Sequence, residues 1–492
     1  MRIKYPDASL QEIDNIMNEA WQAFGEFRRT TLKQRADLMR AIAKGLESSG
    51  DGLIQTAMQE TNLPEARLKN ERIRTMFQLT SYADACEAGS WLEVRIDTAA
   101  AENPDTRKLQ VPIGPVVVFG ASNFPFAYST AGGDTATALA AGCPVVVKGH
   151  PAHAETSDIV AQIISKAVAD AGLPKGVFAH VHGVSFETGK ALVTHTHTRA
   201  VGFTGSYGGG KALFDWANQR KQPIPVFAEM GSINPVFLLP GKLKESAKDL
   251  AATLAGSVTL GTGQFCTNPG LILGVEGKEL DLFISELGAA IGKINPGTML
   301  HPGIAKAYAE KRTAALSQAD VATVAVAAAA PQENQGTPTI ASASAEAFFK
   351  NPLLHQEVFG PYSLVIRCKN TAELVKAARH IEGQLTASVM ATDKDLIDNP
   401  ELIEAAQDIC GRLILNAAPT GVRVALSMQH GGPFPSTTDS RFTSVGADGI
   451  KRWVRPLAFQ SWSDALLPDA LKNSNPLKIW RTVNNKLTQD PI

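Results

Sequence analysis

Residues 116–125 read Val-Val-Val-Phe-Gly-Ala-Ser-Asn-Phe-Pro, and this stretch decides the fold that we expect. An apolar run as short as 116–119 is typical of a strand buried on both faces of a parallel sheet. Similar runs follow at 144–148, 177–182 and 200–204, with helical segments at 130–141, 155–171 and 211–219. This alternation predicts an α/β fold with crossover helices. Ligands of such sheets bind at the carboxyl ends of the strands, where Asn123, Lys148 and Ser206 stand.

Further elements flank this alternating region. Residues 9–48 have helical periodicity, and two apolar stretches within 91–112 predict a β-hairpin. A second alternating unit begins near Pro235, with strands at 236–239 and 271–273 around a helix at 245–260. A strand at 455–460 is expected to add to the hairpin, and the last thirty residues are expected to form a tail over another surface.

Composition excludes several classes of protein. The 492 residues are 44% hydrophobic and 19% charged, with a formal net charge of -1. A chain without basic excess is poorly suited to nucleic acid. The N-terminus lacks an apolar signal core, and no run of about 18 apolar residues occurs, so we expect a soluble, cytoplasmic protein without membrane partners. The five widely spaced cysteines indicate a reducing compartment, without disulfides.

Two motifs have simpler explanations than the chemistry they suggest. Residues 205–211 fit the P-loop pattern, but Ala212 stands where a hydroxyl should hold magnesium. The glycine-rich turn still offers backbone amides to an anion such as a dinucleotide pyrophosphate. Six histidines fall between residues 150 and 197, and we interpret them as surface and loop residues rather than metal ligands.

Cys266 differs from the other cysteines in its surroundings. It lies in the loop Gly-Thr-Gly-Gln-Phe-Cys-Thr-Asn-Pro-Gly at 261–270, whereas Cys143, Cys368 and Cys410 lie in or beside apolar runs. Exposed backbone amides near the sulfur would favour the thiolate, which predicts a reactive thiol. Glu229 follows an apolar strand, where a carboxylate is costly unless it is paired or functional.

Taken together, the motifs resemble the aldehyde dehydrogenase superfamily over nearly the whole chain. They are Asn123-Phe-Pro, Lys148, Phe203-Thr-Gly-Ser206, Glu229-Met-Gly, Gly263-Gln-Phe-Cys266 and Gln356-Glu357-Val-Phe-Gly-Pro361. The segments Leu63-Pro-Glu-Ala-Arg-Leu, Lys148-Gly-His-Pro-Ala-His and Asn475-Pro-Leu-Lys-Ile-Trp-Arg are similar to one branch of it. That branch contains 2,5-dioxopentanoate (α-ketoglutarate semialdehyde) dehydrogenases and bacterial NADP-dependent fatty aldehyde dehydrogenases.

The resemblance implies a role for each site residue. Cys266 would attack the aldehyde to give a thiohemiacetal and then a thioester. Asn123 and the Cys266 backbone amide would hold the oxyanion, and Glu229 would activate the hydrolytic water. The cofactor residues would be Lys148 at the adenosine ribose, Gly205 and Ser206 at the pyrophosphate, Glu357 at the nicotinamide ribose and Phe359 near the nicotinamide.

The resemblance also implies the substrate, cofactor and organisation. The segment after Lys148 has no acid at the position where NAD-preferring relatives carry one, which predicts NADP as cofactor with NAD possible. The expected substrate is 2,5-dioxopentanoate. A medium- or long-chain aliphatic aldehyde is the alternative, and a non-catalytic nucleotide-binding protein on the same fold is the rival from another class. Candidates for contact with the distal end of the substrate are Arg441, Arg452 and Arg455.

The implied architecture has three parts. Residues 1–233 would form N-terminal helices and a Rossmann-like cofactor domain, 234–435 an α/β catalytic domain, and 436–492 a C-terminal segment. The hairpin at 91–112 and the strand at 455–460 would form a small β bridging element, which pairs subunits into a homodimer or homotetramer.

Overall fold

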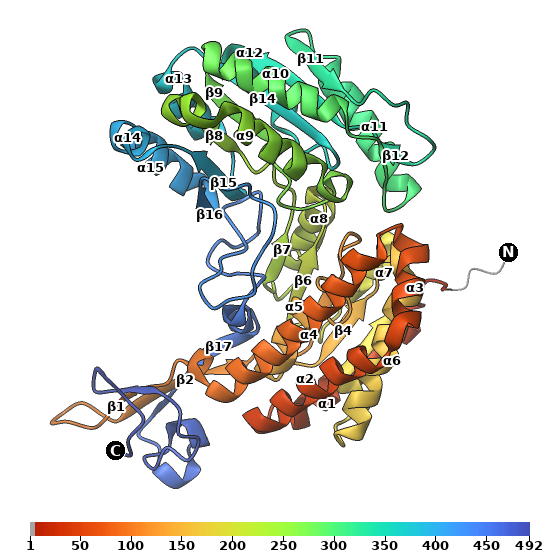
Figure 1. Ribbon diagram of the computed structural model, residues 1–492. Helices are drawn as coiled ribbons and strands as arrows, with labels where there is room; N and C mark the ends of the chain where they lie inside the picture. Colours follow the sequence, from red (N-terminus) through yellow and green to blue (C-terminus); the bar gives the residue numbers. More distant parts are fainter. Residues whose placement is uncertain (1–4) are drawn as a thin grey trace.

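The computed structural model describes residues 5–492 and shows three larger sheets, with helices around two of them, and one two-stranded sheet (Figure 1). Its N-terminal helices are α1 (Leu10–Phe27), α2 (Leu32–Ser48), α3 (Gly50–Thr61) and α4 (Glu65–Ala88). Ser9 and Thr31 begin α1 and α2 with capping boxes. In each box the N-cap hydroxyl accepts the backbone N–H of the N3 residue, and the N3 side chain accepts the backbone N–H of the N-cap residue.

The first sheet confirms the predicted α/β alternation. It is parallel, in the order β5-β4-β3-β6-β7. The strands are β3 (Val116–Phe119), β4 (Val145–Lys148), β5 (Phe178–Val181), β6 (Ala200–Thr204) and β7 (Val226–Glu229). The connecting helices are α5 (Gly133–Ala141), α6 (Ala154–Asp170), α7 (Phe186–Thr194) and α8 (Tyr207–Asn218). The strand order reverses between β3 and β6, so a crevice is expected at the carboxyl ends of these two strands.

The second sheet has the order β11-β13-β14-β9-β8-β15-β16, and only β11 runs antiparallel to its neighbour. Its strands are β8 (Val236–Leu238), β9 (Leu271–Val275), β11 (Val321–Val326), β13 (Thr339–Ser344), β14 (Tyr362–Cys368), β15 (Gln384–Met390) and β16 (Cys410–Leu415). Its helices are α9 (Pro240–Thr259), α10 (Lys278–Gly292), α11 (Pro302–Leu316), α12 (Ala345–Lys350), α13 (Thr371–His380), α14 (Asp393–Asp398) and α15 (Pro400–Ile409). Two short strands, β10 (Gly297–Thr298) and β12 (Gln335–Gly336), pair beside it.

The third sheet, in the order β17-β2-β1-β18-β19, extends away from the other two (Figure 1). The strands β1 (Arg95–Asp97) and β2 (Thr106–Pro112) form a hairpin, and β17 (Val454–Gln460) pairs antiparallel with β2. The end of the chain differs from the expected tail. It contributes β18 (Arg481–Val483) and β19 (Lys486–Thr488), and β18 pairs parallel with β1. The buried Arg481 donates to the carbonyls of Lys472 and Asp490 on either side of this hairpin.

Within residues 5–492, no helix combines the length and the apolar character needed to cross a bilayer. The carboxyl ends of the first sheet face the second sheet, and the long loop of residues 416–446 returns from β16 to the first sheet. Two backbone contacts hold that return. Thr437 bridges Glu229 at the end of β7, and the Met230 amide donates to the Ser436 carbonyl at 2.8 Å.

Candidate active site

The loop that carries Cys266 follows α9 and is shaped by left-handed backbone. Gly261, Thr262 and Gly263 have φ of 54°, 57° and 66°. At Gly263 a side chain is excluded twice, because a Cβ would also lie 2.2 Å from the backbone carbon of Gly360. This glycine therefore lets the loop pack directly against the segment that carries Glu357.

A buried amide network fixes the backbone on either side of the sulfur. The Asn234 side-chain nitrogen donates to the carbonyls of Cys266 at 2.8 Å and Asn268 at 3.0 Å. Gln384 on β15 in turn accepts the backbone amide of Asn234 at 3.2 Å, and that of Ile233 at 2.7 Å. Because buried amides are costly to leave unpaired, this network specifies one loop conformation.

Cys266, His430 and Glu229 come together at the centre of the site. The His430 Nε2 lies 3.6 Å from the Cys266 Sγ and 3.1 Å from the Glu229 Oε1. The ring contact to Glu229 has the separation of an ion pair without hydrogen-bond geometry, since Oε1 has no hydrogen-bond partner among the described residues. Ser444 donates to the other carboxylate oxygen, Oε2, at 2.7 Å. The imidazole is therefore directed at the sulfur.

The electrostatics differ from the reactive thiolate that the sequence predicts. Burial and the neighbouring Glu229 carboxylate raise the pKa of Cys266 well above its ordinary value, and Arg412 offsets only part of that rise. Burial also acts to raise the pKa of Glu229, but the adjacent His430 imidazole and the Ser444 hydroxyl hold it below its usual range. At neutral pH the resting site thus contains the Cys266 thiol and the Glu229 carboxylate. The backbone amides near the sulfur do not offset the rise in thiol pKa that this buried carboxylate causes.

Asn123 lies beside this group, in the turn that follows β3. Its side chain is buried, and its Nδ2 donates to the Gln264 carbonyl at 3.0 Å, two residues before Cys266. An amide nitrogen carries two protons. The second N–H can therefore serve an oxygen next to the sulfur while the first holds the amide in place.

A cleft of about 410 Å³ opens from the sulfur along the ends of the first sheet. Seven of the predicted site residues line it: Asn123, Gly205, Ser206, Glu229, Cys266, Glu357 and Phe359. The sequence analysis did not identify other residues that line the cleft, including His301, Tyr308 and Lys311, which belong to the part of the chain that forms the second sheet. The cleft thus lies between the two α/β units, at the strand-order reversal of the first sheet.

The residues of this cleft suit a dinucleotide. Ser206 caps α8, where its hydroxyl accepts the Gly209 amide at 3.3 Å, so the first amides of α8 adjoin the cleft. At the other end Glu357 is half-buried, and desolvation of its carboxylate raises its pKa. Its Oε1 accepts only a long bond, 3.4 Å, from the Ser232 amide, and a Cβ on Gly231 would lie 2.8 Å from its Oε2. A carboxylate that is so lightly bonded can accept hydroxyls from a ligand.

Lys148 occupies a different position from the other predicted cofactor residues. It ends β4 and is half-buried, and burial lowers its pKa. The cleft is lined instead by His150, two residues further on, whose ring nitrogen Nδ1 accepts the Ala152 amide at 3.1 Å.

The three arginines expected to face the substrate lie elsewhere. Arg441 is exposed and pairs with Asp439 at 2.6 Å, and Arg455 is exposed on β17. Arg452 is buried, and its guanidinium donates to Asp134 at 2.7 Å. None of the three lines the cleft, so they remain candidates that the sequence alone does not place.

Arg67, on α4, lies next to the active-site loop instead. Its Nη2 donates to the Asn123 carbonyl at 2.6 Å, and its guanidinium carbon is 5.0 Å and 4.9 Å from the ring centres of Phe124 and Phe265. These rings belong to the neighbours of Asn123 and Cys266 in the chain. Within residues 5–492 its Nη1 is buried without a hydrogen-bond partner. Arg67 thus offers an unused charged donor beside the site.

Two functional candidates escaped sequence reasoning for different reasons. His430 stands in a loop rich in glycine and proline, Gln429-His430-Gly431-Gly432-Pro433, 164 positions from Cys266. The sequence signal that could have pointed to His430 was a single histidine followed by two glycines. Arg67 belongs to Leu63-Pro-Glu-Ala-Arg-Leu, which served only to indicate a branch. Nothing in that pattern shows which way a helical arginine points.

Comparison with known proteins agrees with this geometry. The model of the "Aldehyde dehydrogenase family" matches residues 2–455. An alpha-ketoglutaric semialdehyde dehydrogenase of Acinetobacter baylyi is 43% identical, over 99% of this chain and 93% of its own length. Alpha-ketoglutaric semialdehyde dehydrogenase 2 of Azospirillum brasilense is 45% identical, over 97% of this chain and 92% of its own length.

Solved structures share the fold at lower identity. A 1-pyrroline-5-carboxylate dehydrogenase superposes with a TM-score of 0.78 at 20% identity, covering 92% of this chain and 86% of its own. A glyceraldehyde-3-phosphate dehydrogenase of Methanocaldococcus jannaschii complexed with NADP gives a TM-score of 0.79 at 18% identity, covering 94% and 96%. Because the family model matches residues 2–455 and two relatives of 43% and 45% identity align over nearly the whole chain, this chain belongs to the aldehyde dehydrogenase family.

Proposed function

We propose that this enzyme oxidises 2,5-dioxopentanoate to 2-oxoglutarate, with NADP as its preferred cofactor. The observation that carries the chemistry is the contact of Cys266, His430 and Glu229 at the inner end of the cleft. The substrate is supported by the two relatives named above, because the alignment spans more than nine-tenths of the length of each.

Catalysis begins with removal of the thiol proton. The Cys266 Sγ passes this proton to the His430 Nε2, which lies 3.6 Å away, and the thiolate then attacks the aldehyde carbon. The carbonyl oxygen becomes an alkoxide, which the free N–H of Asn123 and the Cys266 backbone amide stabilise, a contribution of about 3–4 kcal/mol per donor. A bound nicotinamide supplies the acceptor for the hydride of the thiohemiacetal.

Hydrolysis of the thioester then falls to Glu229. Its low pKa keeps the carboxylate ionised at neutral pH, so it can take a proton from water as the water oxygen attacks the acyl carbon. The carbon–sulfur bond breaks, and the product leaves as a carboxylate. His430 returns its proton to the sulfur and Glu229 releases the proton from water to solvent, which restores the resting thiol and carboxylate.

The cofactor is held by residues of both α/β units. Ser206 and the first amides of α8 bind the pyrophosphate, with Gly205 leaving room for it. Glu357 accepts the ribose hydroxyls at the nicotinamide end, and Phe359 packs there. His150 lines the cleft beyond the end of β4, and the segment from Lys148 to Pro151 has no acid that would repel a 2′-phosphate. This arrangement supports NADP.

Arg67 provides selectivity for an oxo acid. The distal group of 2,5-dioxopentanoate is a carboxylate, and Arg67 is the half-buried cation that touches both rings beside the site. A guanidinium with an unused buried N–H gains most from an anionic partner.

The second candidate is a medium- or long-chain aliphatic aldehyde. The rings of Phe124, Tyr128 and Phe265 favour it, since Phe124 packs edge-on against the other two at 5.1 Å and 5.6 Å. This wall suits an alkyl chain.

A comparison of kcat/KM for 2,5-dioxopentanoate and hexanal, with NADP and with NAD, tests the proposal. We expect the dioxo acid and NADP to be favoured. Equal or lower efficiency with the dioxo acid would rule out the substrate, and a hundredfold preference for NAD would rule out the cofactor.

Cys266→Ala should lose at least about 10³-fold in turnover while still binding NADP. Undiminished turnover would show that Cys266 is not the nucleophile, and no turnover by the parent would favour a non-catalytic protein.

A further inference from the structure

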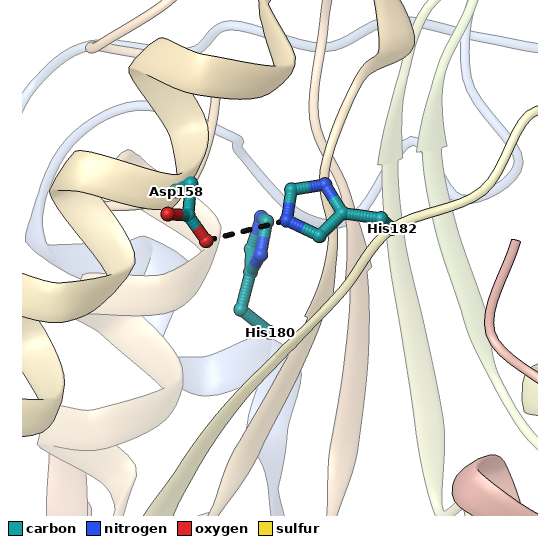
Figure 2. Close-up of side chains that lie close together, drawn as sticks. All are labelled: Asp158, His180 and His182. Carbon is teal, nitrogen blue, oxygen red and sulfur yellow. Dashed lines mark hydrogen bonds and ion pairs between the residues drawn. The ribbon is translucent and has the colours of Figure 1, made fainter. Parts of the chain in front are cut away.

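A second cluster of ligand-type side chains lies on the first sheet, outside the machinery described above. His180 belongs to β5, His182 follows it at once, and Asp158 extends from α6 toward both (Figure 2). Residues two apart on a strand point to the same face, so both rings meet the helix that packs there. One ligand atom from each of the three residues lies within 4.8 Å of the others.

The arrangement has an open position as well as ligands. The His182 Nε2 lies 3.3 Å from the Asp158 Oδ1, and the ring centres of the two histidines are 4.6 Å apart. In the described chain the His180 Nε2 is buried and has no hydrogen-bond partner. Gly149 packs closely against this nitrogen, because a Cβ at that position would lie only 2.5 Å from it.

From this geometry we propose that Asp158, His180 and His182 form a binding site for a divalent transition-metal ion of the Zn²⁺ class. Tetrahedral ligands at about 2.0–2.2 Å from Zn²⁺ are about 3.3–3.6 Å apart, and the His182–Asp158 pair already has that separation. Two imidazoles and one carboxylate suit Zn²⁺, Co²⁺ or Ni²⁺ rather than Mg²⁺, which prefers oxygen ligands. Water completes the shell, because the side chains of Asp158 and His182 are 33% and 20% exposed.

The chain contains a closely matched constellation that lacks the third ligand. His195 and His197 are also two residues apart, and the His195 Nε2 lies 3.2 Å from the Asp14 Oδ1. The His197 ring instead stacks on Trp21, with ring centres 5.0 Å apart. His195→Gln therefore removes the same kind of histidine–aspartate pair without touching the proposed site.

The test is titration of the full-length protein with Zn²⁺ and with Co²⁺, followed by calorimetry and visible absorption. All proteins carry Cys266→Ser, because Glu229, Cys266 and His430 also place ligand atoms within 4.8 Å of one another and would bind such ions through sulfur. We expect one ion per chain, a Co²⁺ d–d spectrum without a thiolate charge-transfer band, and a higher Tm with the ion bound.

The variants decide whether these three residues hold the ion. His180→Gln, His182→Gln and Asp158→Asn should each weaken binding at least tenfold and remove the metal-dependent rise in Tm. His195→Gln should leave both unchanged. Circular dichroism and the metal-free Tm identify any variant that has not folded, and the Co²⁺ spectrum of the folded variants then carries the test. Absence of saturable binding by the parent, unchanged affinity in His182→Gln, or equal loss in His195→Gln would overturn the proposal.

Discussion

At the scale of single residues, the site depends on a half-buried thiol next to a buried carboxylate. Each charge disfavours the other, so the pKa of Cys266 rises while Glu229 remains ionised through His430 and Ser444. The raised pKa keeps the Cys266 thiol protonated at neutral pH, which also makes it less open to oxidation. Activation then requires a proton acceptor within reach of the sulfur, and His430 is in that position.

Glu229→Gln should make the resting thiol more reactive while it stops turnover. Removal of the negative neighbour lowers the pKa of Cys266, so thiolate forms at a lower pH. We expect the pH profile of iodoacetamide labelling of the cofactor-free enzyme to move to lower pH, while kcat falls by about 10²–10⁴ because the general base is lost. Peptide mass spectrometry measures labelling at Cys266, with the half-exposed Cys410 as internal control. A profile that does not move would contradict the assigned charge coupling.

His430→Gln should slow thiol activation and change its dependence on pH. The variant loses the acceptor at 3.6 Å, so the thiol must ionise directly against a raised pKa. We expect kcat/KM to fall by about 10²–10⁴ at pH 7 and to recover in part as the pH rises. A loss of the same size at every pH would indicate a structural role, with Tm showing whether the fold is retained.

Arg67→Gln should discriminate between the two candidate substrates. Loss of a charged hydrogen bond of about 1.5–3 kcal/mol predicts a fall of about 10–100-fold in kcat/KM for the dioxo acid. Hexanal should be affected much less, since it has no anionic end. Arg72→Gln on the same helix, whose guanidinium donates to the Gly50 carbonyl, is the matched control. Equal losses for both substrates would show that Arg67 only supports Asn123.

At the scale of elements, close backbone packing between loops holds the site. The Cys266 loop lies on the Gly360 backbone, and the loop of residues 416–446 reaches back to β7. Neither contact can be predicted from the periodicity of apolar residues in the sequence, because that periodicity indicates only the helices and strands that these loops connect. Strands such as β3 and β4 could be predicted because burial on both faces demands an unbroken apolar run.

Gly263→Ala should destabilise the protein and impair the site. The substitution forces a Cβ into Gly360 at a positive φ, which predicts a loss of about 1–3 kcal/mol in the free energy of unfolding. The exposed Gly256 of α9 is the control, because a Cβ there meets no described atom within 4 Å. Gly256→Ala should raise stability by about 0.5–1 kcal/mol. The Tm of both variants measures the difference, and a neutral Gly263→Ala would refute the packing argument.

At the scale of the whole molecule, two of the edge strands, β16 and β17, are candidates for subunit contact. β16 ends the seven-stranded sheet and presents Leu413 and Leu415, which are 39% and 52% exposed. β17 ends the third sheet. Open edges with apolar side chains are templates for pairing with another chain. They support the homodimer or homotetramer that the family resemblance implies.

Light scattering on the eluting protein should therefore give a mass of two or four chains. Leu415→Lys should reduce that mass, because a charge would be buried where β16 meets the partner. Ile397→Lys replaces a side chain on α14 that is 77% exposed and should leave the mass unchanged. A monomeric parent, or a Leu415→Lys protein with the parental mass, would exclude this edge.

The sequence by itself determined the α/β class, the nucleophile loop and most of the cofactor cleft. Its signals are local, because a buried strand needs apolar residues in succession and a site at a strand end needs a polar residue just after them. The tertiary structure alone decided which residues from distant segments meet there. His430 lies beside Cys266 although 164 residues separate them in sequence, Arg67 packs against Phe265, and two of the six clustered histidines lie beside Asp158. Those contacts, and the raised pKa of the thiol, depend on burial and on long-range neighbours that no local pattern encodes.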